Sequence, residues 1–216
     1  MTEQVVVVGA SGFGRECLDV LDAMVEAGAD LTVLGVVDDG ITDVNRERLA
    51  ARGVAFLGTR AEWLATEPGS VAYVMGIGSP GVRARLVAEL DVMGLRPFTA
   101  IHPSATFGAQ VVLDEGAVVC AQAAISNNVR LGRHVHVNPN ATIGHDADLR
   151  EFVSINPAAV ISGEVVVGSG TLVGAAATVL QNLTVGERVL VGAGSVVTKD
   201  VPADVVVKGV PGRWEE

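Results

Sequence analysis

Residues 101–202 divide without interruption into consecutive sixes: IHPSAT FGAQVV LDEGAV VCAQAA ISNNVR LGRHVH VNPNAT IGHDAD LREFVS INPAAV ISGEVV VGSGTL VGAAAT VLQNLT VGERVL VGAGSV VTKDVP. The first position of every six is Ile, Leu, Val or Phe, and the fifth is nearly always Ala or Val. A short fixed period marks a solenoid, in which each unit stacks on the previous one. One large and one small inward position fit a short strand followed by a corner, so three sixes close one triangular coil. The repeat therefore predicts a β-solenoid.

Because three sixes make one coil, side chains that lie three sixes apart are expected to stack directly above one another. This rule places Asn127, His145 and Gly163 in one column at the third position of their sixes. Because the first and fifth positions fill the core, a side chain at the third position points outward. His145 is therefore predicted to expose its imidazole beside Gly163, where no side chain obstructs the approach of a substrate.

The composition suits a narrow, repetitive core. The chain has 216 residues, of which 49% are hydrophobic but only 4% are aromatic, and 26 are glycine. Such a core is filled with Val, Ala, Leu and Ile, and frequent corners account for the glycines. The length allows two modest domains, or one elongated domain with an appendage.

The charge pattern argues against several classes of partner. The formal net charge is −10, and no Lys/Arg cluster marks a nucleic-acid surface. No apolar run is long enough to span a membrane, and the run at residues 5–10 lacks the features of a signal peptide. Cys17 and Cys120 form no metal-type or redox pair and are expected to pack in the core. These features predict a soluble, cytoplasmic protein.

Strand-like and helix-like segments alternate in the first hundred residues. Apolar runs predict strands at 4–9, 31–37, 54–57 and 71–77, and periodic apolar positions predict helices at 14–27, 61–66 and 82–93. This alternation indicates a parallel sheet with helical crossovers. We therefore expect an α/β domain over residues 1–100, followed by the solenoid over residues 101–216.

A glycine-rich turn joins the first expected strand to the first expected helix. Gly9, Gly12 and Gly14 follow the pattern G-x-x-G-x-G, which differs from the dinucleotide spacing G-x-G-x-x-G. The turn still offers backbone N–H groups and a positive helix end to a phosphate, and Asp38 and Asp39 follow the second strand, where a ribose or base edge would lie. The pattern allows a nucleotide-linked ligand. It equally allows glycines that only permit a tight turn, beside a solvated acidic pair.

His145 is followed directly by Asp146. A carboxylate beside an imidazole can fix its tautomer and raise its basicity, as a general base near neutral pH requires. A surface His–Asp pair at an ordinary corner is the alternative that the residues alone leave open. The other histidines, His102, His134 and His136, have no acidic or cysteine partner at a metal-ligand spacing, so we expect them to be structural or surface residues.

The sequence gives no support to covalent nucleophilic catalysis. It has no G-x-S-x-G elbow, and neither cysteine lies near a histidine along the chain. Glycoside hydrolysis would need two converging carboxylates, for which flat coil faces offer no obvious cleft. A solenoid with glycine-rich corners instead offers long grooves lined by backbone amides, which suit an extended, pantetheine-like ligand.

The repeat, the segment NPNATIGHDADLREFVSINPAAVISGEVVVG and the ending VGAGSVVTKDVPADVVVKGVPGR resemble bacterial sugar acyltransferases with hexapeptide repeats. The N-terminal VVVVGASGFGRE and the later VVDDG match the same proteins, so the resemblance covers essentially the whole chain. The groups that it resembles most are the sialic acid O-acetyltransferases and the nucleotide-aminosugar N-acetyltransferases of bacillosamine and perosamine biosynthesis.

The resemblance implies a Rossmann-like domain that binds a nucleotide sugar, followed by a left-handed parallel β-helix that carries acyl transfer. It also implies a homotrimer, with acetyl-CoA in the groove between neighbouring helices and no metal. His145 matches the family's general base, and Asp146 matches the carboxylate that makes this base stronger. The implied substrate-binding residues are Ser11, Gly12, Phe13, Asp38 and Asp39. The implied acetyl-CoA-binding residues are Ser154, Gly163, Ala175, Ala193, Gly209 and Pro211.

Two positions depart from the family pattern. Phe13 stands where many relatives carry a histidine in the glycine turn, which bears on the contacts to the sugar. Ser154 lies nine residues after His145 and stands where relatives carry a histidine associated with the acetyl-CoA thioester. A serine hydroxyl can still donate a hydrogen bond to a carbonyl oxygen.

Three functions are compatible with these observations. The leading hypothesis is direct transfer of an acetyl group from acetyl-CoA to the amine of a nucleotide-linked aminosugar, with His145 as general base. O-acetylation of sialic acid or another sugar hydroxyl would use the same base on a different acceptor. A non-catalytic trimeric scaffold is the alternative from another class of protein.

Overall fold

The computed structural model describes residues 2–215, and it begins with an α/β part built on a parallel sheet of strand order β2-β1-β3. Val5 and Val7 face the side of the sheet on which α1 and α2 pack, whereas Val6 and Val8 face α3 and α4. The α/β part consists of β1 (Glu3–Val8), α1 (Gly12–Glu26), β2 (Leu31–Val37), α2 (Asp43–Ala51), α3 (Arg60–Leu64), β3 (Ala72–Met75) and α4 (Pro80–Val92).

The glycine turn brings three backbone segments into direct contact. A Cβ at Gly14 would lie 1.9 Å from the carbonyl oxygen of Gly9, and a Cβ at Gly76 would lie 2.6 Å from the Cα of Gly14. Side chains at these positions would therefore separate α1 from β1 and from the turn after β3. Gly12 differs, because nothing lies within 4 Å of the point where its Cβ would be. Packing thus explains Gly9 and Gly14, and Gly12 leaves open space at the start of α1.

Two sequence expectations for the α/β part are corrected by the structure. The strand expected at 54–57 forms only an isolated parallel bridge between Val36 and Phe56. The segment leaves the sheet after this pair because Thr59 already caps α3. Helix α2 was not expected, since Leu49 is its only buried residue and it therefore lacks an apolar stripe.

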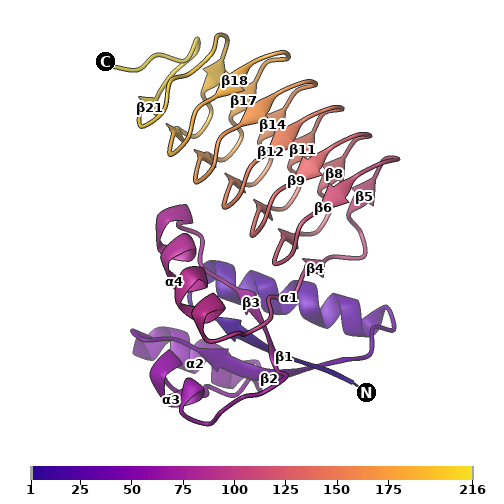
Figure 1. Cartoon of the computed structure of the whole chain (residues 1–216), viewed down its shortest axis with the longest axis vertical. Coiled ribbons are helices and arrows are strands. Elements are labelled where there is room, and N and C mark those ends of the chain that lie inside the picture. The colour runs from indigo at the N-terminus through magenta and orange to yellow at the C-terminus, as the bar shows by residue number, and fades with distance from the viewer. Residues whose placement is uncertain (1, 216) are drawn as a thin grey trace.

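The remainder of the chain is a left-handed parallel β-helix, in which each coil contributes one short strand to each of three sheets (Figure 1). The first sheet contains β4 (Ala100–Ile101), β7 (Val118–Val119), β10 (His136–Val137), β13 (Ser154–Ile155), β16 (Leu172–Val173), β19 (Leu190–Val191) and β21 (Val206–Val207). The second contains β5 (Thr106–Phe107), β8 (Ala124–Ile125), β11 (Thr142–Ile143), β14 (Val160–Ile161), β17 (Thr178–Val179) and β20 (Val196–Val197). The third contains β6 (Val112–Leu113), β9 (Arg130–Leu131), β12 (Asp148–Leu149), β15 (Val166–Val167) and β18 (Thr184–Val185).

The predicted stacking of residues three sixes apart is confirmed by the strand register. Thr142 pairs with Val160, and Ile143 pairs with Ile161. The first and fifth positions of the sixes fill the interior, as shown by the complete burial of Ile143 at a first position and by Ala147 at a fifth. The fourth position turns the corner in the left-handed backbone region, with φ 59° at Asp146. Non-glycine residues adopt this region at some energetic cost, so the corners are set by the ladder of coils rather than by local preference.

The last coil is shorter than the repeat predicts. Val185 is bridged to Val201, and Leu190 of β19 pairs with Val206 of β21, so in both pairs the partners are closer along the chain than three full sixes. The six that begins at Val197 therefore makes a tighter corner than the others. Asp200 stabilises this corner, because its Oδ1 accepts a hydrogen bond from the backbone N–H of Thr184 at 2.8 Å.

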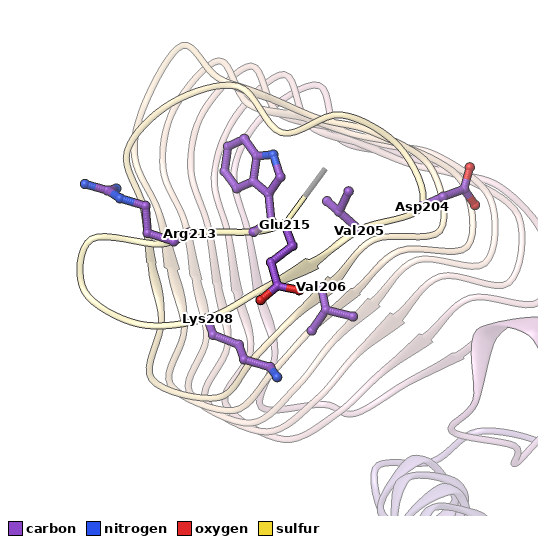
Figure 2. Close-up of a pocket in the computed structure, with 7 residues that line it drawn as sticks. Asp204, Val205, Val206, Lys208, Arg213 and Glu215 are labelled. Carbon is purple, nitrogen blue, oxygen red and sulfur yellow. The ribbon is translucent and has the colours of Figure 1, made fainter.

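The chain then folds back across the end of the solenoid. Lys208 and Arg213 form an antiparallel bridge, and Trp214 packs against the core of the last coils with the ammonium group of Lys199 4.5 Å from its ring centre. Figure 2 shows the triangular outline of the coils seen end-on, with Val205 and Val206 beside the returning segment. A cavity of about 560 Å³ remains at this end.

The α/β part lies at the N-terminal end of the solenoid, which extends away from it toward the C-terminus (Figure 1). Helix α1 packs on the outer face of the first strands of the first sheet, where Cys17 and Leu18 lie in one cluster with Val118 and Cys120. Both cysteines are buried, as predicted. On the other side, Phe152 of the solenoid packs against the cluster that contains the inner face of α4.

Four polar residues are buried where the α/β part meets the solenoid, and we refer to them as the polar seam. They are Arg83, His134, His136 and Ser154. Aromatic rings flank the two histidines: His134 lies between Tyr73 and Phe152 in a parallel stack, with centroid distances of 5.9 and 5.6 Å, and His136 stacks on Phe13 at 4.4 Å. His134 and His136 are thus structural, in agreement with one of the two sequence expectations.

Burial of the seam histidines predicts a loss of stability in acid. Desolvation, followed by the charges of nearby arginines, lowers the pKa of His134 to about 4 and lowers that of His136 well below its usual value. Unfolded chains bind protons on histidine near pH 6.5, so between about pH 6.5 and 4 the unfolded state binds more protons and folding weakens as pH falls. Each histidine contributes at most about 1.4 kcal/mol per pH unit within this window.

The variant His134→Phe tests this prediction. Phenylalanine keeps the aromatic stack, and Phe152 already occupies the equivalent corner one coil further on with the same left-handed backbone. We expect urea unfolding midpoints measured between pH 7.5 and 4.5 to fall less steeply for the variant than for the wild type. Equal slopes for the two proteins would contradict the assignment of acid sensitivity to His134.

Candidate functional site

The corner between β11 and β12 holds the predicted His–Asp pair. His145 Nδ1 lies 2.6 Å from Asp146 Oδ2, and the two side chains are 55% and 44% exposed. The backbone ladder fixes the corner from both sides, because Asp146 N–H donates to the carbonyl of Asn127 and the carbonyl of His145 accepts from Glu164 N–H. The adjacency that the sequence left open is therefore a direct hydrogen-bonded contact.

Asp146 is held by a second partner. Asn128, one coil earlier, donates from Nδ2 to Asp146 Oδ1 at 3.0 Å, so each carboxylate oxygen has its own hydrogen bond. The bond to His145, and then that to Asn128, lower the pKa of Asp146. An ionised carboxylate accepts the hydrogen of Nδ1, which leaves the lone pair on Nε2 of the imidazole. Within residues 2–215 no side chain hydrogen-bonds to Nε2, so this atom is free to act as a base.

Gly163 lies under the imidazole, as the stacking rule predicts. A Cβ at Gly163 would be 2.5 Å from Nε2 and 2.6 Å from Cε1 of His145. The ring therefore lies against a patch of backbone that only a glycine can provide. The backbone N–H of Gly163 makes no hydrogen bond within the described part of the chain, so it is available to an oxygen of a ligand.

A pocket of about 210 Å³ opens at the carboxyl ends of β1 and β2 in the α/β part. Its acidic residues, Asp38 and Asp39, are both engaged within the protein: Asp38 accepts from the N–H groups of Ala10 and Gly40, and Asp39 accepts from the backbone and the guanidinium of Arg60. Hydrogen bonds to Arg60 lower the pKa of Asp39 against the opposing effect of desolvation. The lining residues are Val8, Gly9, Val37, Asp38, Asp39, Gly40, Arg60, Ile77, Val82, Arg85 and Leu86.

The three predicted substrate residues of the glycine turn face in different directions. Ser11 and Gly12 are exposed at the start of α1, where the Ser11 side chain makes no capping hydrogen bond and the first turn has no acidic residue. The helix end is thus open to an anion. Phe13 instead points toward the solenoid, where its ring stacks on His136. The structure does not bring Phe13 to the pocket lined by Asp38 and Asp39.

The predicted acetyl-CoA residues lie at two different corners of one chain. Ala175 and Ala193 are exposed and stack in the corner column that follows the first sheet. Gly209 lies on the coil after Ala193 and, because that last coil is short, continues the column toward Pro211. Gly163 is at the His145 corner, where the second sheet leads into the third. The two groups therefore lie on different corner columns of the solenoid.

Ser154 has a different place from the other predicted acetyl-CoA residues. It is 1% exposed and belongs to the polar seam. Its hydroxyl accepts a hydrogen bond from Arg83 Nη2 at 2.9 Å and donates one to the carbonyl of Gly78 at 3.3 Å. Within one chain the structure does not bring it beside His145.

Sequence reasoning missed three residues near these sites. Asn128 orients Asp146, and the spacing of three sixes would have identified it. Arg60 and Arg85 line the α/β pocket, but nothing in their local sequence distinguishes them from other surface arginines.

Two further features bear on the class of protein. Among residues 2–215, no group of three or more His, Cys, Asp or Glu side chains is arranged to hold a metal ion. No helix in the same residues combines the length and the apolar character needed to cross a membrane.

Comparisons with known proteins agree with this architecture. Residues 4–90 match the family described as the PglD N-terminal domain. PerB from Caulobacter crescentus, solved with CoA and GDP-perosamine, superposes with a TM-score of 0.87 and 29% identity over 100% of this chain and 99% of the other. The acetyltransferase domain of PglB from Neisseria gonorrhoeae, solved with acetyl coenzyme A, gives a TM-score of 0.84 and 26% identity over 100% of both chains. The chain is therefore similar in sequence and in fold to bacterial acetyltransferases of this architecture.

A curated acetyltransferase also matches in sequence. The GDP-perosamine N-acetyltransferase of Escherichia coli is 28% identical over 134 residues, which cover 61% of this chain and 58% of the relative. The match therefore spans little more than half the length of that relative. The predicted Rossmann-like and acyltransferase architecture is thus shared with proteins of known structure, whereas the roles of individual residues rest on their geometry.

Substitution of Gly163 tests the importance of the open patch beside the imidazole. The change Gly163→Ala places a methyl group against the His145 ring without a positive-φ penalty, so the ring must move. A displacement of about 1 Å can cost on the order of a hundredfold in rate, and we expect acetyl-transfer kcat to fall at least about tenfold.

The control is Ser169→Ala, which makes a similar small change at a third position on another corner. We expect both variants to unfold at nearly the wild-type temperature and only Gly163→Ala to lose activity. Full activity in folded Gly163→Ala would show that the position of the ring does not matter.

Proposed function

We propose that this chain is an acetyl-CoA-dependent N-acetyltransferase that acts on a nucleotide-linked aminosugar. The observation that carries the proposal is the exposed His145 imidazole, oriented by Asp146 and resting on the bare backbone of Gly163. Its relatives supply the substrate class, since PerB was solved with CoA and GDP-perosamine.

The chemistry assigned to His145 is direct transfer. As the sugar amine attacks the thioester carbonyl, an N–C bond forms, the C–S bond breaks, and Nε2 of His145 takes the amine proton. The proton then passes to the departing CoA thiolate, so that free CoA and the amide are the products. The unpaired N–H of Gly163 lies beside the imidazole and is suited to stabilise the negative charge that develops on the carbonyl oxygen.

Asp146 supports this step without contacting the substrate. Its hydrogen bond to Nδ1 selects the tautomer with a free Nε2 and stabilises the imidazolium that forms. Asn128 fixes the other carboxylate oxygen, so the imidazole plane is held by a chain of two hydrogen bonds across neighbouring coils.

The acceptor site is assigned to the α/β pocket. The open end of α1, with the free hydroxyl of Ser11 and the uncovered backbone at Gly12, suits a diphosphate. Asp38 and Asp39 shape the neighbouring pocket and fix its loops, although their carboxylates already have partners within the protein. A nucleotide placed here would direct its sugar away from the sheet.

The two halves of the proposed site are separate in one chain. All lining residues of the α/β pocket come from the α/β part, and the contacts of His145 come from the solenoid. We therefore propose a homotrimer in which neighbouring solenoids bring Gly163 of one copy opposite Ala175 and Ala193 of the next, with acetyl-CoA between them. Exposed apolar side chains on the solenoid, among them Val112 and Leu190, suit such contacts. A cytoplasmic location remains a prediction.

The variant His145→Ala tests the mechanism. A positioned base contributes on the order of 10²–10⁴ to the rate, so kcat should fall at least about a hundredfold. Size-exclusion chromatography should show the same assembly as the wild type, because the side chain is exposed and makes no core contact. Undiminished turnover would remove the proposed mechanism.

The variant Asp146→Asn tests the supporting role of the carboxylate. We expect a smaller loss of kcat than in His145→Ala, since the base is still present. The acidic limb of the pH–rate profile should move to lower pH, because a neutral amide no longer stabilises the imidazolium. An unchanged profile would indicate that the carboxylate does not influence the base during turnover.

The acceptor is identified by thiol release from acetyl-CoA across a panel of nucleotide-linked aminosugars, with free sialic acid as comparison. Turnover with an aminosugar nucleotide supports the proposal. Turnover only with sialic acid favours O-acetylation, and absence of both turnover and acetyl-CoA binding by calorimetry favours a scaffold.

A further inference from the structure

Arg83 of α4 is fully buried in the polar seam, and every nitrogen of its guanidinium is hydrogen-bonded. Nε donates to the carbonyl of His134 at 3.1 Å. Nη1 donates to the carbonyls of Ile77 and Gly78 at 2.8 and 3.2 Å. Nη2 donates to the carbonyl of Phe152 at 2.7 Å and to the hydroxyl of Ser154 at 2.9 Å. One planar group thus joins the turn after β3 to two neighbouring levels of the solenoid.

No carboxylate among residues 2–215 pairs with this buried cation. Its charge is met by carbonyl dipoles and one hydroxyl, and burial lowers the pKa of Arg83 to about 9. Such an arrangement is a costly way to hold two surfaces together, because an apolar side chain of similar size would avoid the desolvation of a charge. The guanidinium is a rigid group of hydrogen-bond donors, so it fixes the direction of each bond, which an apolar contact cannot do.

The two solenoid corners that Arg83 contacts are the ends of one coil. His134 and Phe152 are three sixes apart, and the coil between them carries the His145–Asp146 corner. Arg83 is therefore bonded to the start and to the end of the coil that holds the proposed base.

One of the two α/β carbonyls that Arg83 contacts belongs to a wall of the α/β pocket. Ile77, whose carbonyl binds Nη1, lines that pocket, and so do Val82, Arg85 and Leu86 from the same helix as Arg83. The guanidinium itself is not among the lining residues. The guanidinium lies behind this wall of the pocket, and its hydrogen bonds connect the wall to the solenoid.

We propose that Arg83 is a positioning residue, which fixes the orientation of the nucleotide-sugar pocket relative to the solenoid coil that carries His145. The inference rests on the proposed function. In a trimer the same bonds set the distance from each pocket to the base of a neighbouring copy, because both are placed through the solenoid. Loss of the Arg83 guanidinium should leave the nucleotide-sugar and acetyl-CoA sites intact but misalign the sugar amine with the thioester.

The test compares Arg83→Met and Arg83→Lys with wild type in the full chain. We expect kcat for acetyl transfer to fall at least about tenfold, since sub-ångström placement governs the step. The Kd values for acetyl-CoA and for UDP or GDP, measured by calorimetry, should stay within about threefold of wild type, because no group that touches either ligand has changed. Arg83→Lys keeps a buried cation with fewer donors, so it should show a smaller loss of kcat and serves if Arg83→Met does not fold.

The matched control is Arg133→Met. Arg133 of the solenoid also connects to α4, through Asp91 at 2.7 Å, and it pairs with Glu115 of the preceding coil at 2.7 Å. Both ion pairs are partly exposed and do not touch the pocket wall. We expect near-normal kcat in this variant. A folded Arg83→Met with unchanged kcat would overturn the proposal, as would a parallel loss of kcat and of both affinities.

Hydrogen exchange separates this proposal from the proposed function. In Arg83→Met, amides at 76–78 and at the corners near residues 134 and 152 should exchange faster, while those of the C-terminal coils stay protected. If the wild type transfers acetyl to no nucleotide-linked aminosugar, the proposed function fails and the exchange pattern alone decides on Arg83. Unchanged protection at the three segments would then overturn its positioning role.

Discussion

The hydrogen-bonded stacking of each coil on the coil before it, in a strict register of three sixes, is the constraint on which the rest of the structure depends. It buries a core of small aliphatic side chains and forces the fourth position of the sixes into a left-handed corner. It also aligns the proposed site, because Asn128, Asp146 and His145 meet only when two neighbouring coils keep this register. The geometry of the proposed catalytic residues is thus set by the hydrogen-bonded stacking of the coils and not by the conformation of a single loop.

The α/β part depends on a different kind of contact. Its sheet and helices form apolar clusters, one of which continues into Val118 and Cys120 of the solenoid, and buried polar groups also lie at this boundary. Aromatic rings stack on His134 and His136, and Arg83 supplies directed bonds from the corners at His134 and Phe152 to the pocket wall. Apolar packing provides cohesion across this boundary, and the polar groups restrict the parts to one orientation.

The sequence predicted the solenoid, its coil-on-coil register and the contact between His145 and Gly163, because each follows from a strict period. It failed where that period ends, at the shortened coil before Val201, and where an element lacks an apolar stripe, as in α2. The polar seam could not be predicted either. Arg83 hydrogen-bonds to solenoid segments that are far from it along the chain, so no local sequence pattern predicts these contacts.

The shortened coil and the returning C-terminal segment have a consequence for assembly in solution. An unprotected terminal coil presents free main-chain groups, onto which another molecule could add strands end to end. Here the chain crosses its own last coil, with Gly212 N–H donating to the carbonyl of Val196 and Trp214 packed on the core. At the opposite end the first coil is less well covered, and Phe107, at an inward first position, is 37% exposed. The C-terminal end of the solenoid is therefore closed to fibrous growth by the chain's own last residues.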